Sequence, residues 1–178
     1  MKYVIVDLEA TCWEGSKVHD MEIIEIGAVL LCGISNQPIS DYQEFVLPVE
    51  NPQLSEFCKK LTTIKQSQID TSHHFPDVFE EFLEWINQEE FKLCSWGNFD
   101  MELIELECKR HSMNLPKNFM YHINLKDLYA RAYSTKASIG FKQVLRKLGM
   151  EFEGTMHRGL DDARNIARVA ENLLVLDK

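Results

Sequence analysis

The sequence has little of what marks secreted, repetitive or membrane-spanning proteins. Its five cysteines are an odd number without C-x-x-C spacing, which argues against a disulfide framework and a structural zinc site. Eight glycines and five prolines form no linker, and no apolar run approaches the roughly 20 residues that span a bilayer. The N-terminus does not resemble a signal peptide. We therefore expect a single cytoplasmic domain over residues 1–178.

Positive charge is also scarce. The chain has 19 Lys and Arg against 28 Asp and Glu, a net charge of −9, which is unfavourable for binding phosphates. The charge is unevenly spread, because residues 41–100 carry 12 acidic and 4 basic residues, whereas residues 101–150 carry 9 basic and 4 acidic residues. A local basic surface is compatible with this distribution, and bound metal ions would add positive charge. The charge balance therefore neither excludes nor establishes a nucleic-acid enzyme.

The hydrophobic pattern predicts an α/β fold. Apolar, β-branched runs at 2–8, 23–31 and 42–47 indicate three antiparallel strands joined by short loops. Helices and strands then alternate: a helix after Pro76, a strand at 91–96, a helix at 101–111, a strand at 122–125, and helices at 127–132, 141–148 and 160–176. This order predicts a mixed five-stranded sheet flanked by helices, as in the ribonuclease H-like fold, although the periodicity alone permits other α/β folds.

Two acidic residues follow the first apolar strand. Asp7 and Glu9 are two residues apart, so both side chains leave the same face of the predicted sheet. Adjacent carboxylates repel and burial makes their ionisation costlier, whereas a divalent cation relieves both penalties. The alternative is that the strand simply ends here and both acids are solvated.

Acidic residues also begin two predicted helices. Asp100 follows the apolar segment FKLCSW, and a helix N-cap is the competing interpretation of its role. Asp162 lies in the first turn of the last helix, where an aspartate would also complement the helix dipole. His157 precedes that helix in a loop, and a largely neutral imidazole there can accept a proton.

Together the four carboxylates are hard to explain as solvated ends and caps. Asp7, Glu9, Asp100 and Asp162 all fall at strand ends or helix starts that can converge on one edge of the sheet. Four carboxylates at one spot are destabilising unless metal ions neutralise them. Two divalent ions, Mg²⁺ or Mn²⁺, can clamp an in-line phosphoryl displacement while His157 takes the proton of the attacking water. The sequence therefore predicts a phosphodiesterase.

The same residues resemble a known nuclease family. The segments VDLEATC, EIIEIGAVLL, SWGNFD and HRGLDDARNIARVAENLL are similar to the motifs of DEDDh exonucleases in the DnaQ-like superfamily, and the resemblance spans nearly the whole chain. The spacing from His157 to Asp162 is typical of the histidine subtype. DLEATCWEG, QLSEFCKKLT, LGMEFEG and GLDDARNIAR most resemble the exoribonuclease branch that trims histone-mRNA ends and small interfering RNAs.

The resemblance implies an activity and a set of site residues. It implies removal of nucleotides from the 3′ end of single-stranded RNA as nucleoside 5′-monophosphates, with the four carboxylates as ligands of two metal ions and His157 as general base. It also implies that Ala10 and Thr11 contact the terminal nucleotide and that the rings of Phe57 and Phe99 flank its base. For either phenylalanine, ordinary core packing is the competing interpretation.

The chain departs from this branch in two places. Thr63 stands where relatives usually have Gly, and Phe99 where animal relatives often have Trp. We expect no additional nucleic-acid-binding domain, so stem-loop recognition is not implied. A DNA-directed, proofreading-type exonuclease, an oligoribonuclease and a catalytically silent nucleic-acid-binding module stay open as alternatives. The intact set of five catalytic residues argues against the silent module. The sequence indicates neither protein partners nor an oligomeric state.

Overall fold

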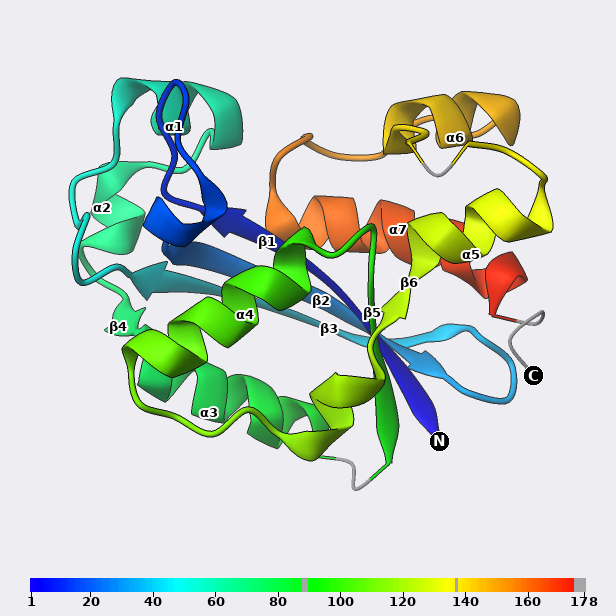
Figure 1. Ribbon diagram of the computed structural model, residues 1–178, viewed down its shortest axis with the longest axis horizontal. Helices are drawn as coiled ribbons and strands as arrows, with labels where there is room; N and C mark the ends of the chain where they lie inside the picture. Colours follow the sequence, from blue (N-terminus) through cyan, green and yellow to red (C-terminus); the bar gives the residue numbers. More distant parts are fainter. Residues whose placement is uncertain (88–89, 137, 175–178) are drawn as a thin grey trace.

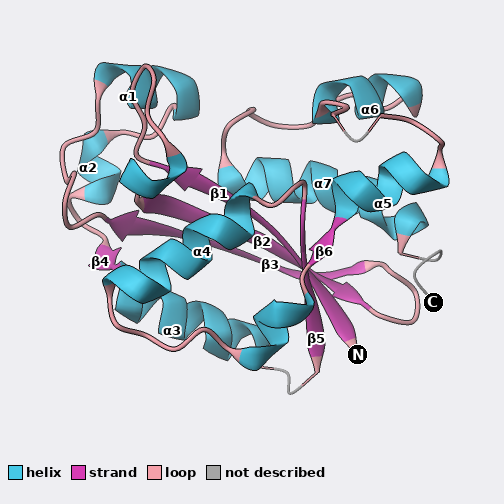
Figure 2. Cartoon of the chain, viewed as in Figure 1, coloured by secondary structure: helices cyan, strands magenta, loops and turns pink. Residues whose placement is uncertain are grey.

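A six-stranded sheet forms the centre of the computed structural model, which describes residues 1–87, 90–136 and 138–174 (Figures 1 and 2). In the order β4-β3-β2-β1-β5-β6, β1, β2 and β3 are antiparallel, whereas β5 is parallel to β1 and β6 to β5. The strands are β1 (Lys2–Ala10), β2 (Ile23–Cys32), β3 (Pro38–Leu47), β4 (His73–His74), β5 (Phe91–Ser95) and β6 (Ile123–Asn124). The predicted mixed sheet is confirmed, with the two-residue β4 as an added edge strand.

Helices cover both faces of the sheet. They are α1 (Glu56–Thr62), α2 (Gln66–Ile69), α3 (Phe75–Ile86), α4 (Phe99–Arg110), α5 (Leu125–Ala132), α6 (Phe141–Lys147) and α7 (Gly159–Leu173), with 3-10 turns at Val18–Asp20 and Lys117–Tyr121. The sequence pattern predicts α3 to α7 within a few residues and does not predict α1 or α2. The predicted end of the last helix, at 176, lies outside the described residues. In the described parts of the chain, every helix is too short or too polar to span a membrane.

Alternation along β1 directs its side chains into two separate cores. Val4 and Val6 pack with α3 and α4 on one face, whereas Tyr3 and Ile5 pack with α5, α6 and α7 on the other. Because both faces are covered, the strand is apolar without interruption from Tyr3 to Val6. Asp7 then continues the face of Tyr3 and Ile5, so the first acidic residue of the chain points to the side of α7.

The first turn of α7 rests directly on the backbone of the sheet because two glycines meet there. Gly27 of β2 pairs with Asp7 of β1. A Cβ on Gly27 would lie 2.0 Å from backbone atoms of Gly159 and Leu160, and a Cβ on Gly159 would lie 2.9 Å from the carbonyl oxygen of Asp7. Only glycine permits so close an approach. The contact therefore brings the start of α7 to the acidic end of β1.

Helix α1 is fixed on the other side of that end. The hydroxyl of Ser55 accepts a hydrogen bond from the Cys58 N–H at 3.0 Å as the N-cap of α1, and it also donates to the carbonyl of Cys12 just after β1. Cys58 is buried against Ile24 of β2. In Figure 1 the arrowhead of β1 accordingly ends between α1 and the first turn of α7.

Candidate active site

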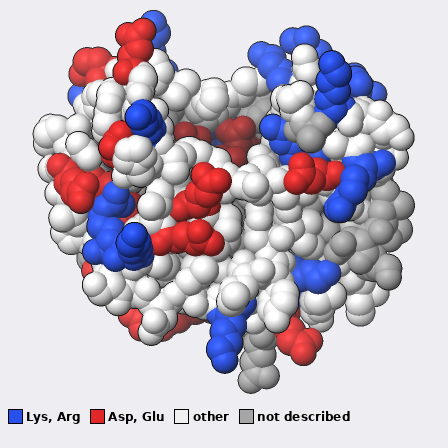
Figure 3. All heavy atoms as spheres, viewed as in Figure 1, with Lys and Arg blue, Asp and Glu red and all other residues white. Residues whose placement is uncertain are grey.

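A cavity of about 350 Å³ opens at the carboxyl end of β1. Figure 3 shows a hollow between the two upper lobes, with acidic side chains on its floor. The lining residues come from β1 and the chain after it, α1, the start of α4 and the start of α7: Asp7, Leu8, Glu9, Ala10, Cys12, Met21, Leu61, Trp96, Phe99, Asp100, His157 and Asp162. All five residues predicted to take part in catalysis thus share one cavity.

Three of the carboxylates converge closely. One oxygen from each of Asp7, Glu9 and Asp162 lies within 4.8 Å of the others. Strand alternation brings the first two together, and the contact of α7 with Gly27 brings the third to them. Carboxylate oxygens are the ligands that hard cations such as Mg²⁺ prefer. The chemistry and spacing of this group therefore fit a divalent cation.

Asp100 reaches the same cavity from the opposite face of the sheet. It lies in the first turn of α4, is only 4% exposed, and its Oδ1 accepts a hydrogen bond from the Leu8 N–H at 3.0 Å. The N-cap position of α4 belongs to Asn98, so the interpretation of Asp100 as a helix cap is wrong. The hydrogen bond to β1 instead holds the carboxylate at the cavity.

Burial and mutual repulsion make the ionised carboxylates costly. Burial raises the pKa of Asp7 well above its usual range, and the other three carboxylates raise it further. Burial, followed by the charge of Asp162, raises the pKa of Glu9 to about 9. Burial raises the pKa of Asp100 to about 6, although the N–H of Leu8 favours the ionised form. A metal-free site therefore retains protons near neutral pH, and a divalent cation would displace them.

A buried ion pair holds the turn that precedes α7. Glu25 lies opposite Glu9 in the sheet, is 0% exposed, and accepts hydrogen bonds from Arg158 Nε at 3.1 Å, Arg158 Nη2 at 3.2 Å and the Gly159 N–H at 3.1 Å. The guanidinium also lies 5.4 Å from the centroid of the Phe45 ring. Such two-point pairing fixes orientation as well as distance. The sequence pattern does not single out this pair, and the only local signal is a carboxylate inside an apolar strand.

His157 is exposed on the cavity wall at the end of this turn. Its φ of 60° places it in the left-handed region, which non-glycine residues adopt uncommonly and which is often found at functional sites. The next residue, Arg158, donates its backbone N–H to Asp162 Oδ2 at 3.1 Å. This bond closes the turn and presents the imidazole beside the carboxylates, where it can accept a proton from a water molecule.

A family model described as exonuclease (RNase_T) matches residues 4–170. This chain belongs to the exonuclease family. It is 37% identical over 179 residues to 3'-5' exoribonuclease 1 of Rattus norvegicus, a match that covers 96% of this chain and 52% of that protein. It is 36% identical over 194 residues to ERI1 exoribonuclease 2 of Homo sapiens, covering 96% of this chain and 28% of that protein. The chain thus spans about half or less of the length of these relatives.

Solved structures of similar proteins support the assignment of this chain to the exonuclease family. The nuclease domain of 3'hExo, a DEDDh family member bound to rAMP, matches with a TM-score of 0.92 and 34% identity over 98% of this chain and 92% of that chain. Cell-death related nuclease 4 (CRN-4) matches with a TM-score of 0.90 over 98% of this chain and 64% of that chain, and its 22% identity shows the fold alone. The resemblance to DEDDh exonucleases and the ribonuclease H-like fold are confirmed.

The cavity at the end of β1 has an apolar wall as well as an acidic floor. Phe99 lines it and is 39% exposed. Phe57 of α1 is 48% exposed but is not among the described residues lining the cavity, whereas Leu61, one turn farther along α1, is. The exposure of both rings contradicts the core-packing interpretation. Trp96 and Leu61 are further lining residues that the sequence pattern does not single out.

The two residues that follow Glu9 differ in whether they line the cavity. Ala10 lines the cavity. Thr11 is 3% exposed, and its Oγ1 accepts a hydrogen bond from the Glu22 N–H at 2.9 Å, which closes the β1–β2 ladder. A direct contact between Thr11 and substrate stays a prediction.

Thr63 occupies the position where the chain leaves α1. Its φ of 61° is left-handed, and its N–H donates to the Lys59 carbonyl at 3.0 Å to end the helix. Glycine adopts this conformation without strain, whereas a β-branched residue does not. Thr63 therefore ends the helix at an energetic cost that the Gly implied by the family resemblance would not carry.

Proposed function

We propose that this chain is a metal-dependent 3′–5′ exonuclease that acts on single-stranded RNA and releases nucleoside 5′-monophosphates. The observation that carries the proposal is the convergence of Asp7, Glu9 and Asp162 within 4.8 Å in a cavity whose wall also bears His157. The names of two similar relatives, 3'-5' exoribonuclease 1 and ERI1 exoribonuclease 2, support RNA as the substrate and the 3′ end as the point of attack.

The residues of the cavity fit two divalent metal ions, Mg²⁺ or Mn²⁺. Asp7, Glu9, Asp162 and Asp100 would hold them, since four carboxylates with raised pKa values in one cavity need a positive partner to ionise. When bound, such ions stabilise the charge that develops on the attacking and leaving oxygens of the phosphodiester.

Side chains of this protein accept the proton and bind the substrate. His157 accepts the proton of the attacking water, and the buried pair of Glu25 and Arg158 keeps its loop in place. Phe57 and Phe99 flank the terminal base, while Ala10 and Thr11 contact the terminal nucleotide. Stacking on an aromatic ring is worth about 1–3 kcal/mol per base and is indifferent to base identity, which suits an enzyme that digests any sequence.

A labelled single strand tests the proposal. A 5′-labelled RNA of about 20 nucleotides, long enough to exceed the site of one binding domain, is incubated with Mg²⁺, Mn²⁺ or EDTA. We expect a ladder that shortens from the 3′ end with metal and intact RNA with EDTA. Intact RNA under every metal condition would contradict the proposal. Matched DNA and a length series down to dinucleotides then separate RNA exonuclease activity from the DNA-directed and oligoribonuclease alternatives.

A further inference from the structure

A second cavity lies between the end of α5 and α6, in the part of the chain where basic residues outnumber acidic ones. Its volume is about 630 Å³. Figure 3 shows Lys and Arg side chains gathered over α6, beside the hollow with the acidic floor. The polar groups on its wall are three cations, three hydroxyls and an amide, from Lys136, Arg146, Lys147, Ser134, Thr135, Ser138 and Gln143.

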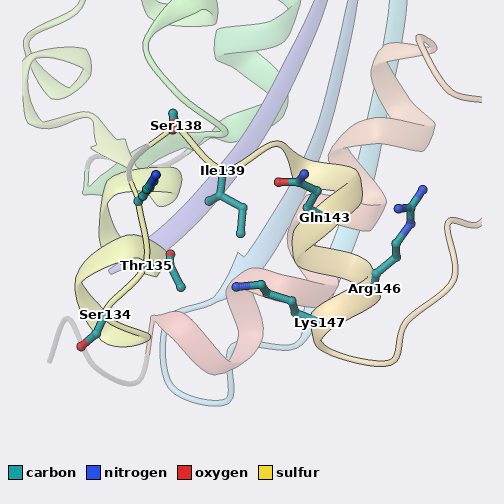
Figure 4. Close-up of a pocket in the computed structure, with 8 residues that line it drawn as sticks. Ser134, Thr135, Ser138, Ile139, Gln143, Arg146 and Lys147 are labelled. Carbon is teal, nitrogen blue, oxygen red and sulfur yellow. The ribbon is translucent and has the colours of Figure 1, made fainter.

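The end of α5 folds back to form this cavity. Ser134 adopts a left-handed φ of 50°, its N–H donates to the Arg131 carbonyl at 3.4 Å, and the Thr135 N–H donates to the Ala130 carbonyl at 2.9 Å. This pair of bonds is a Schellman motif, which reverses the chain at a helix end. Figure 4 shows Lys147 extending from α6 toward Thr135 across the cavity.

The cations of this cavity have no ion-pair partner within the described structure. In residues 1–87, 90–136 and 138–174, no ion pair involves Lys136, Arg146 or Lys147, and no acidic residue lines the cavity. The hydroxyl oxygen of Thr135 is buried and has no hydrogen-bond partner among the described residues. Three cations without an acidic neighbour in the lining match an anion with several acceptor oxygens, and a phosphate has that chemistry.

Helix α6, which forms one wall of the basic cavity, also contacts a residue that lines the candidate active site. Trp96 lines the acidic cavity, and its ring centroid lies 4.9 Å from that of Phe141, the first residue of α6. We propose that the α5–α6 cavity binds a backbone phosphate of the same single strand whose 3′ end occupies the active site, upstream of the bond that is cleaved. The inference rests on the proposed function, and it explains how a chain with a net charge of −9 holds a polyanion.

Equilibrium binding tests the phosphate site separately from cleavage. Fluorescence anisotropy measures the affinity of a labelled single-stranded RNA of about 20 nucleotides for Lys136→Gln/Lys147→Gln in Mg²⁺, with His157→Ala in every protein to keep the strand intact. The matched control is Lys109→Gln/Lys117→Gln, which removes the same charge from exposed lysines elsewhere on the molecule. Circular dichroism checks that all proteins are folded.

We expect the double variant to bind the strand about 5- to 20-fold more weakly and the slope of log affinity against log salt to become shallower by about 0.7, because one fewer phosphate is neutralised. The ratio of the affinity for the long strand to the affinity for a dinucleotide should fall in the double variant and stay unchanged in the control. Equal affinity and salt slope in variant and control would overturn the inference and leave the exonuclease proposal intact. AMP binding as tight as the long strand would also overturn it. If the protein with His157 intact also leaves the strand uncleaved in Mg²⁺, while binding still depends on Lys136 and Lys147, the exonuclease proposal alone would be overturned.

Discussion

Replacing Gly27 with alanine tests whether the close contact between β2 and α7 builds the candidate site. The new Cβ would lie 2.0 Å from backbone atoms of Gly159 and Leu160. Ordinary contacts are about 3.5–4.0 Å, so the first turn of α7 has to move by about 1.5 Å. Asp162 moves with it, away from the two carboxylates of β1. Because a displacement of about 1 Å at a reacting centre can lower the rate about 100-fold, we expect kcat/KM to fall by at least about that factor.

The assay combines kcat/KM on labelled RNA, calorimetric titration with Mn²⁺ and a thermal melt. We expect Mn²⁺ binding to weaken together with the rate, and stability to fall by about 1–3 kcal/mol from overpacking. Gly159→Ala, whose Cβ would lie 2.9 Å from the Asp7 carbonyl oxygen, should give a smaller loss of the same kind. Gly140→Ala is the control, since Gly140 has a φ of −74° and open space around its Cβ position. A folded Gly27→Ala protein with wild-type rate and Mn²⁺ affinity would refute the reasoning.

Four further changes probe the site and its surroundings. His157→Ala should lower kcat by about 10²- to 10⁴-fold, the usual contribution of a general base, while calorimetry finds Mn²⁺ binding largely intact; a wild-type rate would contradict the mechanism. Asp7→Ala should weaken Mn²⁺ binding in the same titration, and unchanged affinity would remove Asp7 from the ligand set. Thr63→Gly should raise the free energy of unfolding in urea by about 1–2 kcal/mol, because a β-branched residue at a φ of 61° is strained; lower stability would show that strain is absent. Since the pKa of Glu9 is raised from 4.5 to about 9, the folded metal-free protein keeps a proton that the unfolded chain releases. Its stability in EDTA should therefore fall by about 1.4 kcal/mol per pH unit across that interval, and Mg²⁺ should remove most of the slope; parallel melting curves with and without metal would disprove the linkage.

Elements with a strong hydrophobic pattern are predictable from the sequence. β1 is covered on both faces and is therefore apolar from Tyr3 to Val6, and α3 buries Val78, Phe79 and Phe82 at helical spacing. β4 is not predictable in this way, because its two exposed histidines form a strand only by pairing with the end of β3. α1 escapes prediction for a similar reason, since only Cys58 and Thr62 of its seven residues are buried.

The acidic site is predictable in part. The common direction of Asp7 and Glu9 follows from strand alternation, and the positions of Asp100 and His157 follow from the ends of strands and helices together with the family resemblance. The pair of Glu25 and Arg158 is separated by 133 residues, and no local pattern joins them. The residues that orient the site are therefore harder to find than the residues that carry its chemistry.

By itself the sequence determined which side chains can hold metal ions and accept a proton, and on which face of β1 the first two lie. Only the tertiary structure decided that Asp162 meets them, that the rings of Phe57 and Phe99 are exposed, and that the basic residues of α5 and α6 share one cavity. The physical reason is that some interactions act within a short segment of the chain, whereas others act between segments far apart in the sequence. Hydrogen bonding and side-chain alternation set the conformation of a short segment from its own residues, whereas the distance between two segments depends on how closely their backbones can pack. In this chain two glycines, one in β2 and one in α7, set that distance.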